Sequence, residues 1–156
     1  SFFDVKNEKF ETSSIPLGVI TLSEKINLHG KNKITFQMER YFQSLKSNLS
    51  NQIDPGFSIG SCSTVSTLSA IHLNLTTFDR KKIEGLLLDV DEIMKIINNL
   101  RNLKVNEMLK HPCIRKKYPL LLNGMEILEK ILENFPIKQI LVSQSGLTGG
   151  MIENLY

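Results

Sequence analysis

The stretch GFSIGSCSTVSTL, residues 56–68, indicates the class of fold. Phe57 and Ile59 alternate with smaller residues, as in a short β-strand. The next five residues are all small: Gly60, Ser61, Cys62, Ser63 and Thr64. The apolar residues after them fall at helical spacing: Val65, Leu68 and Ile71. A strand that breaks into such a loop and opens a helix often binds phosphate, because the first N–H groups of a helix lack partners. A phosphate-binding loop and a simple tight turn are the two interpretations.

Composition is that of an ordinary globular domain. The 156 residues are 41% hydrophobic and 22% charged, which predicts one domain spanning residues 1–156. A net charge of +3 permits an anionic ligand without requiring one. No apolar run approaches the ~20 residues of a membrane span, and the N-terminus lacks the pattern of a signal peptide. Two cysteines far apart, Cys62 and Cys113, are interpreted as free thiols in a reducing cytoplasm.

The hydrophobic pattern predicts an α/β fold, with a mixed sheet flanked by helices. The two internal apolar strands, at 57–60 and 139–143, each end in small residues that precede a helix. Ligands bind at such carboxyl ends in open α/β sheets, which places a site near Gly60–Thr64 and Ser143–Gly150. The other expected elements are two strands within 2–10 with 19–22 as an optional third, a polar loop at 27–33, helices from 34, 63, 90, 105 and 121, an extended segment at 86–88, and a terminal helix within 146–156.

Sharper chemical motifs are missing. No Gly-Lys pair follows Gly60 as a Walker loop needs, and residues 63–72 hold no Arg to serve a cysteine phosphatase. The three histidines stand alone, so no metal ligands are assigned. Asp89 and Glu92 fit a capping box at a helix start better than acid chemistry. Backbone N–H groups at Gly149–Gly150 are a second candidate for an anion, with a flexible turn as the alternative.

Five segments, in order, resemble one family, the exopolyphosphatases and guanosine pentaphosphate phosphohydrolases. Each is similar to a family motif, and the spacings agree along nearly the whole chain. The segments are SIPLGVITLSE at 14–24 (family S-L-P-L-G-x-x-x-L-T-E), GSCST at 60–64 (G-x-G-G-T), IEG at 83–85 (V-H-G), LLNG at 121–124 (I-L-A-G) and SQSGLTGG at 143–150 (S-D-x-G-L-R-E-G).

The resemblance implies an actin-like fold of the ribonuclease-H type. Family members have two such lobes and hydrolyse terminal phosphoanhydride bonds of polyphosphate or guanosine pentaphosphate in the cleft between them, using magnesium. This chain resembles the second lobe, so the first lobe is expected as its partner, together with polyphosphate or guanosine tetra- or pentaphosphate. A homodimer is a further expectation. Because the first lobe would carry the catalytic glutamate, we expect no catalytic residue here.

The resemblance implies phosphate-binding candidates in two loops: Gly60, Ser61, Cys62, Ser63, Thr64, Gly146, Thr148, Gly149 and Gly150. Backbone N–H groups and the Thr64 hydroxyl are the expected donors of the first loop.

Several polar positions depart from the family pattern. Cys62 and Ser63 replace two glycines, and their Cβ atoms stand where backbone N–H groups would approach a phosphate. Glu84 replaces a histidine and adds negative charge, while Thr148 replaces an arginine that could bind an oxyanion bidentately. Lys117-Tyr118-Pro119, Gln144 and Gly149 replace further polar family residues. These changes predict a degenerate or altered member of the family.

Two other functions stay open. The first is a non-catalytic module of the same fold that senses nucleotides or polyphosphate, or that contacts proteins. The second is a nucleic-acid binder that uses Arg80–Lys82 and Arg115–Lys117. Aromatic residues make up only 7% of the chain and none is Trp, so base-stacking platforms are scarce and we expect no nucleic acid as a partner.

Overall fold

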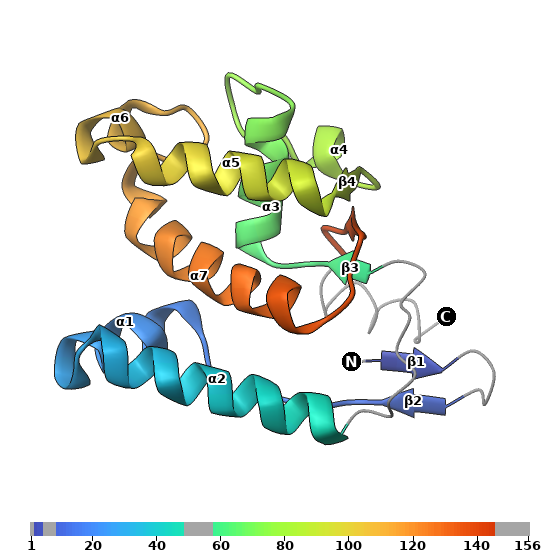
Figure 1. Cartoon of the computed structure of the whole chain (residues 1–156). Coiled ribbons are helices and arrows are strands. Elements are labelled where there is room, and N and C mark those ends of the chain that lie inside the picture. Colours follow the sequence, from blue (N-terminus) through green and yellow to red (C-terminus); the bar gives the residue numbers. More distant parts are fainter. Residues whose placement is uncertain (1, 5–8, 49–57, 146–156) are drawn as a thin grey trace.

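The computed structural model describes residues 2–4, 9–48 and 58–145 (Figure 1). Most of the predicted elements are confirmed, including the strand-loop-helix unit at 58–72. In chain order the elements are β1 (Phe2–Asp4), β2 (Lys9–Glu11), α1 (Val19–His29), α2 (Lys31–Asn48), β3 (Ser58–Gly60), α3 (Ser63–His72), α4 (Arg80–Ile83), β4 (Leu87–Asp89), α5 (Val90–Asn102), α6 (Val105–Lys110), the 3₁₀ helix η1 (Arg115–Lys117), α7 (Tyr118–Asn134) and β5 (Gln139–Val142).

A three-stranded mixed sheet lies at one end of the helical layer. Its strand order is β3-β5-β4, with β3 parallel and β4 antiparallel to the central β5. In the parallel pair, Gly60 is in register with Val142, so both strands end at the same edge of the sheet. β1 and β2 form a separate antiparallel pair.

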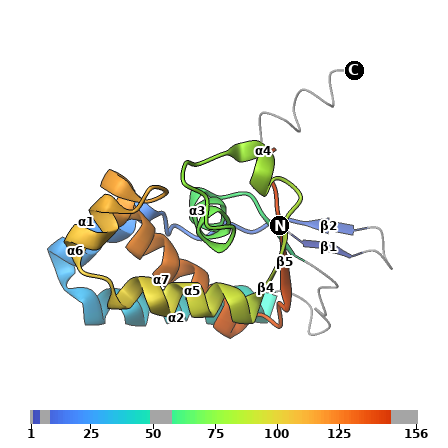
Figure 2. The same ribbon diagram turned by 90° about the horizontal axis from the view of Figure 1, so that it is seen from above.

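Helix α3 occupies the centre of the domain (Figure 2). Its seven residues from Thr64 to Ala70 are all buried. Three of their hydroxyl groups donate to carbonyl oxygens one turn back: Ser66 to Cys62 (3.0 Å), Thr67 to Ser63 (2.8 Å) and Ser69 to Val65 (2.7 Å). These bonds allow polar side chains to be buried, because their hydrogen-bonding capacity is used within the helix.

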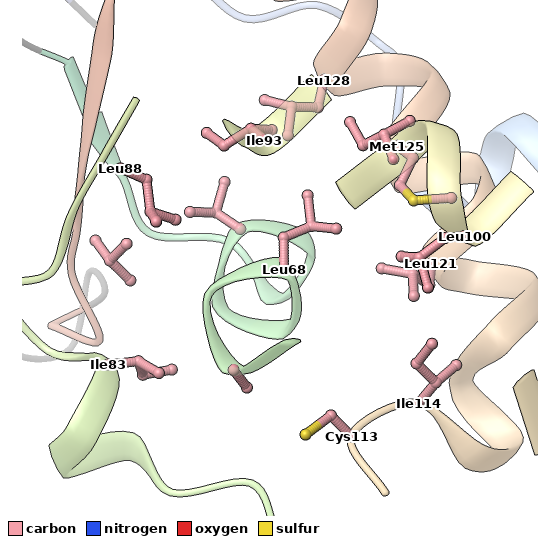
Figure 3. Close-up of a cluster of buried hydrophobic side chains, with 14 of the residues drawn as sticks. Leu68, Ile83, Leu88, Ile93, Leu100, Cys113, Ile114, Leu121, Met125 and Leu128 are labelled. Atoms are coloured by element: carbon pink, nitrogen blue, oxygen red, sulfur yellow. The ribbon is translucent and has the colours of Figure 1, made fainter. Parts of the chain in front are cut away.

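Apolar side chains from the surrounding elements converge on α3 (Figure 3). Leu68, fully buried, lies at the centre of this cluster. α5 contributes Ile93 and Ile97, four residues apart on one face, as its apolar periodicity predicts. Other members are Ile83, Leu88, Leu100, Cys113, Ile114, Leu121, Met125 and Leu128.

The segment 19–33 differs from its prediction. Residues 19–22 begin helix α1 and are not a third strand, because Leu22 and Ile26 lie one turn apart and pack with Ile34 and Met38 of α2. The loop expected at 27–33 is reduced to Gly30. At φ +80° this glycine lets the chain turn sharply from α1 into α2.

Asp89 lies at the N-cap of α5 as predicted, but the prediction that its side chain caps the helix is wrong. Its side chain makes no cap hydrogen bond. Oδ1 of Asp89 instead accepts a hydrogen bond of 2.8 Å from Nε2 of Gln139, its cross-strand neighbour. Sheet pairing therefore competes successfully with the local cap.

Two further expectations concern a membrane-spanning helix and the C-terminal segment. Within residues 2–4, 9–48 and 58–145, no helix combines the length and apolar character needed to cross a membrane. The terminal helix expected within 146–156 lies outside the described residues.

α7 packs against α3 at a point of very close approach. A Cβ built on Gly124 of α7 would lie 2.0 Å from Oγ1 and 3.1 Å from Cβ of Thr64. Both residues are buried. Only a residue without a side chain fits at position 124 while Thr64 is present.

We predict that Gly124→Ala destabilises the domain by about 1–3 kcal/mol, because overpacking outweighs the gain in helix propensity. Thr64→Ala removes the obstructing Oγ1, so the double variant should lose at least about 1 kcal/mol less than the sum of the two single losses. Urea unfolding of the four proteins measures this coupling. Gly18→Ala is the control, since its new Cβ would only touch Oγ1 of Thr21 at 3.7 Å. Additive losses would contradict the prediction.

An ion pair between an exposed arginine and a buried glutamate joins α5 to α7. The guanidinium of Arg101 donates to the carboxylate of Glu129, whose residue is 7% exposed. Burial raises the pKa of Glu129 above its ordinary value; Arg101 opposes this rise, and Glu126 and Glu133 add to it.

The raised pKa of Glu129 makes the native state hold a proton more tightly than the unfolded chain does. The resulting stability is complete below the ordinary glutamate pKa and is lost as pH rises through the native pKa. Gln carries no titrating proton, so its stability does not change with the protonation of this position. The free energy of unfolding of Glu129→Gln, relative to that of the wild-type protein, should therefore be higher at pH 7 than at pH 4. Urea unfolding of both proteins at the two pH values tests this, and the opposite trend would contradict it.

Candidate functional site

Three loops meet at the edge of the sheet where β3 and β5 end. The backbone N–H of Ser143 donates to the carbonyl of Gly60 (3.0 Å), which joins the loop after β5 to the loop after β3. The N–H of Gly85, just before β4, donates to the carbonyl of Val142 (2.9 Å). The structure thus brings together two regions that the sequence placed at one site, and adds a third.

The loop after β3 leads into an uncapped helix N-terminus. Cys62 is the N-cap of α3, and its side chain makes no capping hydrogen bond. Ser66 N–H is the first in α3 to find a helical acceptor, the carbonyl of Cys62 at 3.1 Å. Ser61, Cys62 and Ser63 are exposed. First-turn N–H groups and the positive end of the helix dipole can therefore face an anion here.

Gly60 serves packing at the start of this loop. A Cβ at this position would lie 2.8 Å from Cγ2 of Ile140 and 3.0 Å from Cγ1 of Val65. These neighbours belong to β5 and α3, so the glycine lets the strand and the helix approach one another. This requirement exists whether or not a phosphate binds.

The Thr64 hydroxyl, predicted as a donor to phosphate, points elsewhere. Its residue is 5% exposed, and Oγ1 lies against Gly124 of α7. The hydroxyl is thus directed into the helix contact, and the expected phosphate contact of this hydroxyl finds no support. Binding by the backbone N–H groups of the loop stays a prediction.

Glu84, Gln144 and Ser66 form a hydrogen-bonded network across the three loops. Oε2 of Glu84 accepts from the backbone N–H of Gln144 at 2.5 Å. Nε2 of Gln144 donates to Oγ of Ser66 at 2.7 Å, and this hydroxyl donates to the carbonyl of Cys62. Sequence reasoning noted Glu84 and Gln144 only as departures from a pattern and missed Ser66. The sequence signal that could have revealed the network is that Glu84 and Gln144 both depart from the family pattern.

Glu84 is held on both sides. Before it, Asp79 caps α4 by accepting from Lys81 N–H (3.0 Å), and Ile83 is fully buried in the core. After it, Gly85 turns the chain into β4 at φ +72°, a conformation that favours glycine. The carboxylate is therefore brought to the β5 loop by fixed backbone.

The other candidates lie elsewhere or are not described. Gly146, Thr148, Gly149 and Gly150 fall outside the described residues. The basic residues of α4 and η1 are exposed, and Lys117 lies 5.7 Å from the centre of the Phe78 ring. His72 pairs with Glu92 at 3.5 Å on the side of α3 that faces α5. Within the described ranges, no three His, Cys, Asp or Glu side chains are grouped to hold a metal ion.

This geometry can be compared with known proteins. The model of the Ppx/GppA phosphatase family matches residues 3–156. The chain belongs to the Ppx/GppA phosphatase family. No curated protein matches its sequence.

Solved structures of the family show the same fold. A Ppx/GppA family member from Aquifex aeolicus is 22% identical, with a TM-score of 0.71 over 94% of this chain and 49% of that one. A further structure of the Aquifex aeolicus PPX-GPPA enzyme is 26% identical, with a TM-score of 0.67 over 92% and 49%. An exopolyphosphatase from Cytophaga hutchinsonii is 21% identical, with a TM-score of 0.72 over 96% and 51%. This chain spans about half the length of these proteins and has the expected actin-like α/β fold.

The segments that resemble Ppx/GppA motifs contact one another in space. Thr64 packs on Gly124, as described above. Nδ2 of Asn123 donates to the carbonyl of Val19 at 3.1 Å. Ser143 bonds to Gly60 and Gln144 bonds to Glu84, so all five segments are linked. The positions shared with the family in these contacts, Gly60, Thr64, Gly85 and Gly124, thus maintain packing and backbone geometry.

The two thiols are predicted to differ in reactivity. Cys62 is exposed at the α3 N-terminus, whereas Cys113 is buried and its thiol donates to the carbonyl of Leu75 at 3.2 Å. Burial raises the pKa of Cys113, partly opposed by Arg115. In the native protein, iodoacetamide at pH 8 should modify Cys62 at least about ten times faster than Cys113. Mass spectrometry of the peptides measures both rates.

Unfolding in guanidinium should remove most of this difference, and Cys62→Ser should abolish the fast reaction. Equal rates in the native protein would contradict the assigned burial of Cys113.

Proposed function

We propose that this chain is the second lobe of a two-lobed phosphatase that hydrolyses terminal phosphoanhydride bonds of polyphosphate or guanosine pentaphosphate. The observation that carries the proposal is the uncapped N-terminus of α3 at the carboxyl end of β3 in a Ppx/GppA chain. In this proposal the loop of Gly60–Ser63 and the first N–H groups of α3 bind phosphate oxygens and stabilise their charge.

The complementary lobe would provide the remaining machinery. A carboxylate there would activate the water that attacks the terminal phosphorus, so the lobe itself is the first proposed partner of this chain. The exposed, unpaired thiol of Cys62 is consistent with a cytoplasmic location. A homodimer of the whole protein belongs to the same proposal.

Magnesium was implied by the family resemblance. The described residues do not fit it by themselves, because they hold no suitable group of ligands and because the Glu84 carboxylate already accepts from Gln144 N–H. The proposed role of this lobe is therefore confined to the binding of phosphate by backbone N–H groups.

A specific observation supports a second function, a non-catalytic module of the same fold that senses nucleotides or polyphosphate or contacts proteins. The exposed side chain of Cys62 and the Glu84 carboxylate both lie at the loops that would meet a phosphate. Each disfavours the close approach of a polyanion. Calorimetry with guanosine tetraphosphate and polyphosphate, combined with a phosphate-release assay on a protein that holds both lobes, separates the functions. Hydrolysis supports the phosphatase, and binding alone supports the sensor.

Phosphate binding can be tested with the 156-residue chain through its exposed thiol. Because Cys62 lies at the proposed site, saturating tripolyphosphate should slow its modification by neutral iodoacetamide at least about threefold, relative to sodium chloride of equal ionic strength. Modification of Cys113 in the core should not change. The chain should release no phosphate, since it holds only half of the proposed cleft.

Ser63→Asp is the matched variant. Its carboxylate at the first position of α3 complements the helix dipole, so folding should be preserved while anion binding is opposed. Protection of Cys62 should be lost in this variant. Equal protection in both proteins, or none in the wild-type chain, would contradict phosphate binding at α3.

A further inference from the structure

We propose that Glu84 is an internal anion that sets the affinity of this site for phosphate. The inference rests on the proposed function, since it concerns the same three loops. Its starting observation is the hydrogen bond of 2.5 Å from Gln144 N–H to Oε2 of Glu84. Backbone N–H groups in a loop beside a helix N-terminus are the donors that bind phosphate oxygens in anion sites. Here a carboxylate of the protein itself already occupies one of them.

A chain of hydrogen bonds links Glu84 to the N-terminal turn of α3. Gln144 bonds to the carboxylate through its backbone and to Ser66 of α3 through its side chain. Ser66 in turn bonds to the carbonyl of Cys62, the N-cap residue. Three consecutive hydrogen bonds thus connect the carboxylate to the first turn of the helix. A phosphate bound at that turn would be near a fixed negative charge.

The network also holds Glu84 in place. The side chain is exposed at the surface, but Ile83 is anchored in the core and Gly85 N–H is bonded to Val142. A surface carboxylate with a free backbone would move away from an arriving anion at little cost. A carboxylate on an anchored backbone must either stay and repel the anion or give up the bond to Gln144 N–H.

Both effects lower affinity, and each has its own variant. Glu84→Gln removes the charge and keeps an oxygen that can accept from Gln144 N–H. Glu84→Ala removes the charge and also frees that N–H for the ligand. For a phosphate group of charge about −2, removing the Glu84 charge should strengthen binding about threefold to tenfold at low salt, because such charges repel through water over several ångströms.

Asp91 provides a matched control at the opposite end of the sheet. β4 runs antiparallel to β5, so Gly85 lies near the carboxyl end of β5 and Asp89 pairs with Gln139 at its amino end. Asp91, exposed in the first turn of α5, follows two residues after Asp89. Asp91→Asn changes the net charge by the same amount without altering the three loops.

The experiment measures tripolyphosphate affinity of the 156-residue chain by protection of Cys62 and by calorimetry, at 20 mM and 150 mM sodium chloride. Glu84→Gln should bind about threefold to tenfold more tightly than wild type at low salt, with a smaller gain at high salt. Glu84→Ala should bind at least as tightly as Glu84→Gln, and Asp91→Asn should bind like wild type. Thermal unfolding of each variant shows that it is folded.

Each alternative outcome has one meaning. If wild type binds and Glu84→Gln binds no more tightly, Glu84 only links the loops and the inference is wrong, while the proposed function stands. If Asp91→Asn gains as much as Glu84→Gln, the effect is one of net charge and the inference is also wrong. If neither wild type nor the Glu84 variants bind tripolyphosphate, the proposed binding site and the inference both fail.

Discussion

The burial of α3 on all sides is the constraint on which the rest of the structure depends. A helix at the centre of a domain can carry large side chains only where its neighbours leave room. α3 carries Ser and Thr at many of its buried positions, and the hydroxyl groups of Ser66, Thr67 and Ser69 are bonded to its own backbone. Its small side chains let the sheet and α7 approach closely, and this approach fixes Gly60 and Gly124. The position of the α3 N-terminus follows from the same packing.

Because of this packing, the ends and the middle of the loop at residues 60–64 have different roles. Gly60 and Thr64 bound the segment that resembles a phosphate-binding motif, and both are explained by contacts with β5 and α7. The residues between them, Ser61, Cys62 and Ser63, are exposed. Loss of anion binding in evolution would therefore change the middle of the segment and keep its ends, because only the ends maintain the fold.

Much of the fold was predictable from local pattern. The spacing of Ile34, Met38 and Phe42 predicted α2, since these side chains share one helical face and are buried. Small residues after β3 predicted the entry to α3. Prediction failed at residues 19–22, where a short apolar run fits a strand or a helix, and only packing against α2 decides between them. The prediction that Asp89 caps α5 failed for a similar reason. The Asp89 carboxylate accepts a hydrogen bond from Gln139, which lies 50 residues away in the sequence.

By itself, the sequence determined the order of most helices and strands and the family, and it predicted a loop at which an anion would bind. Periodicity and short motifs are local properties of a chain, so they can be read without a structure. Only the tertiary structure decided which side chains of that site meet. It turned the Thr64 hydroxyl toward α7, and it brought the Glu84 carboxylate to the backbone N–H of Gln144, 60 residues away. Contacts at that separation depend on how the elements pack, because hydrogen bonds and close packing act over a few ångströms in space.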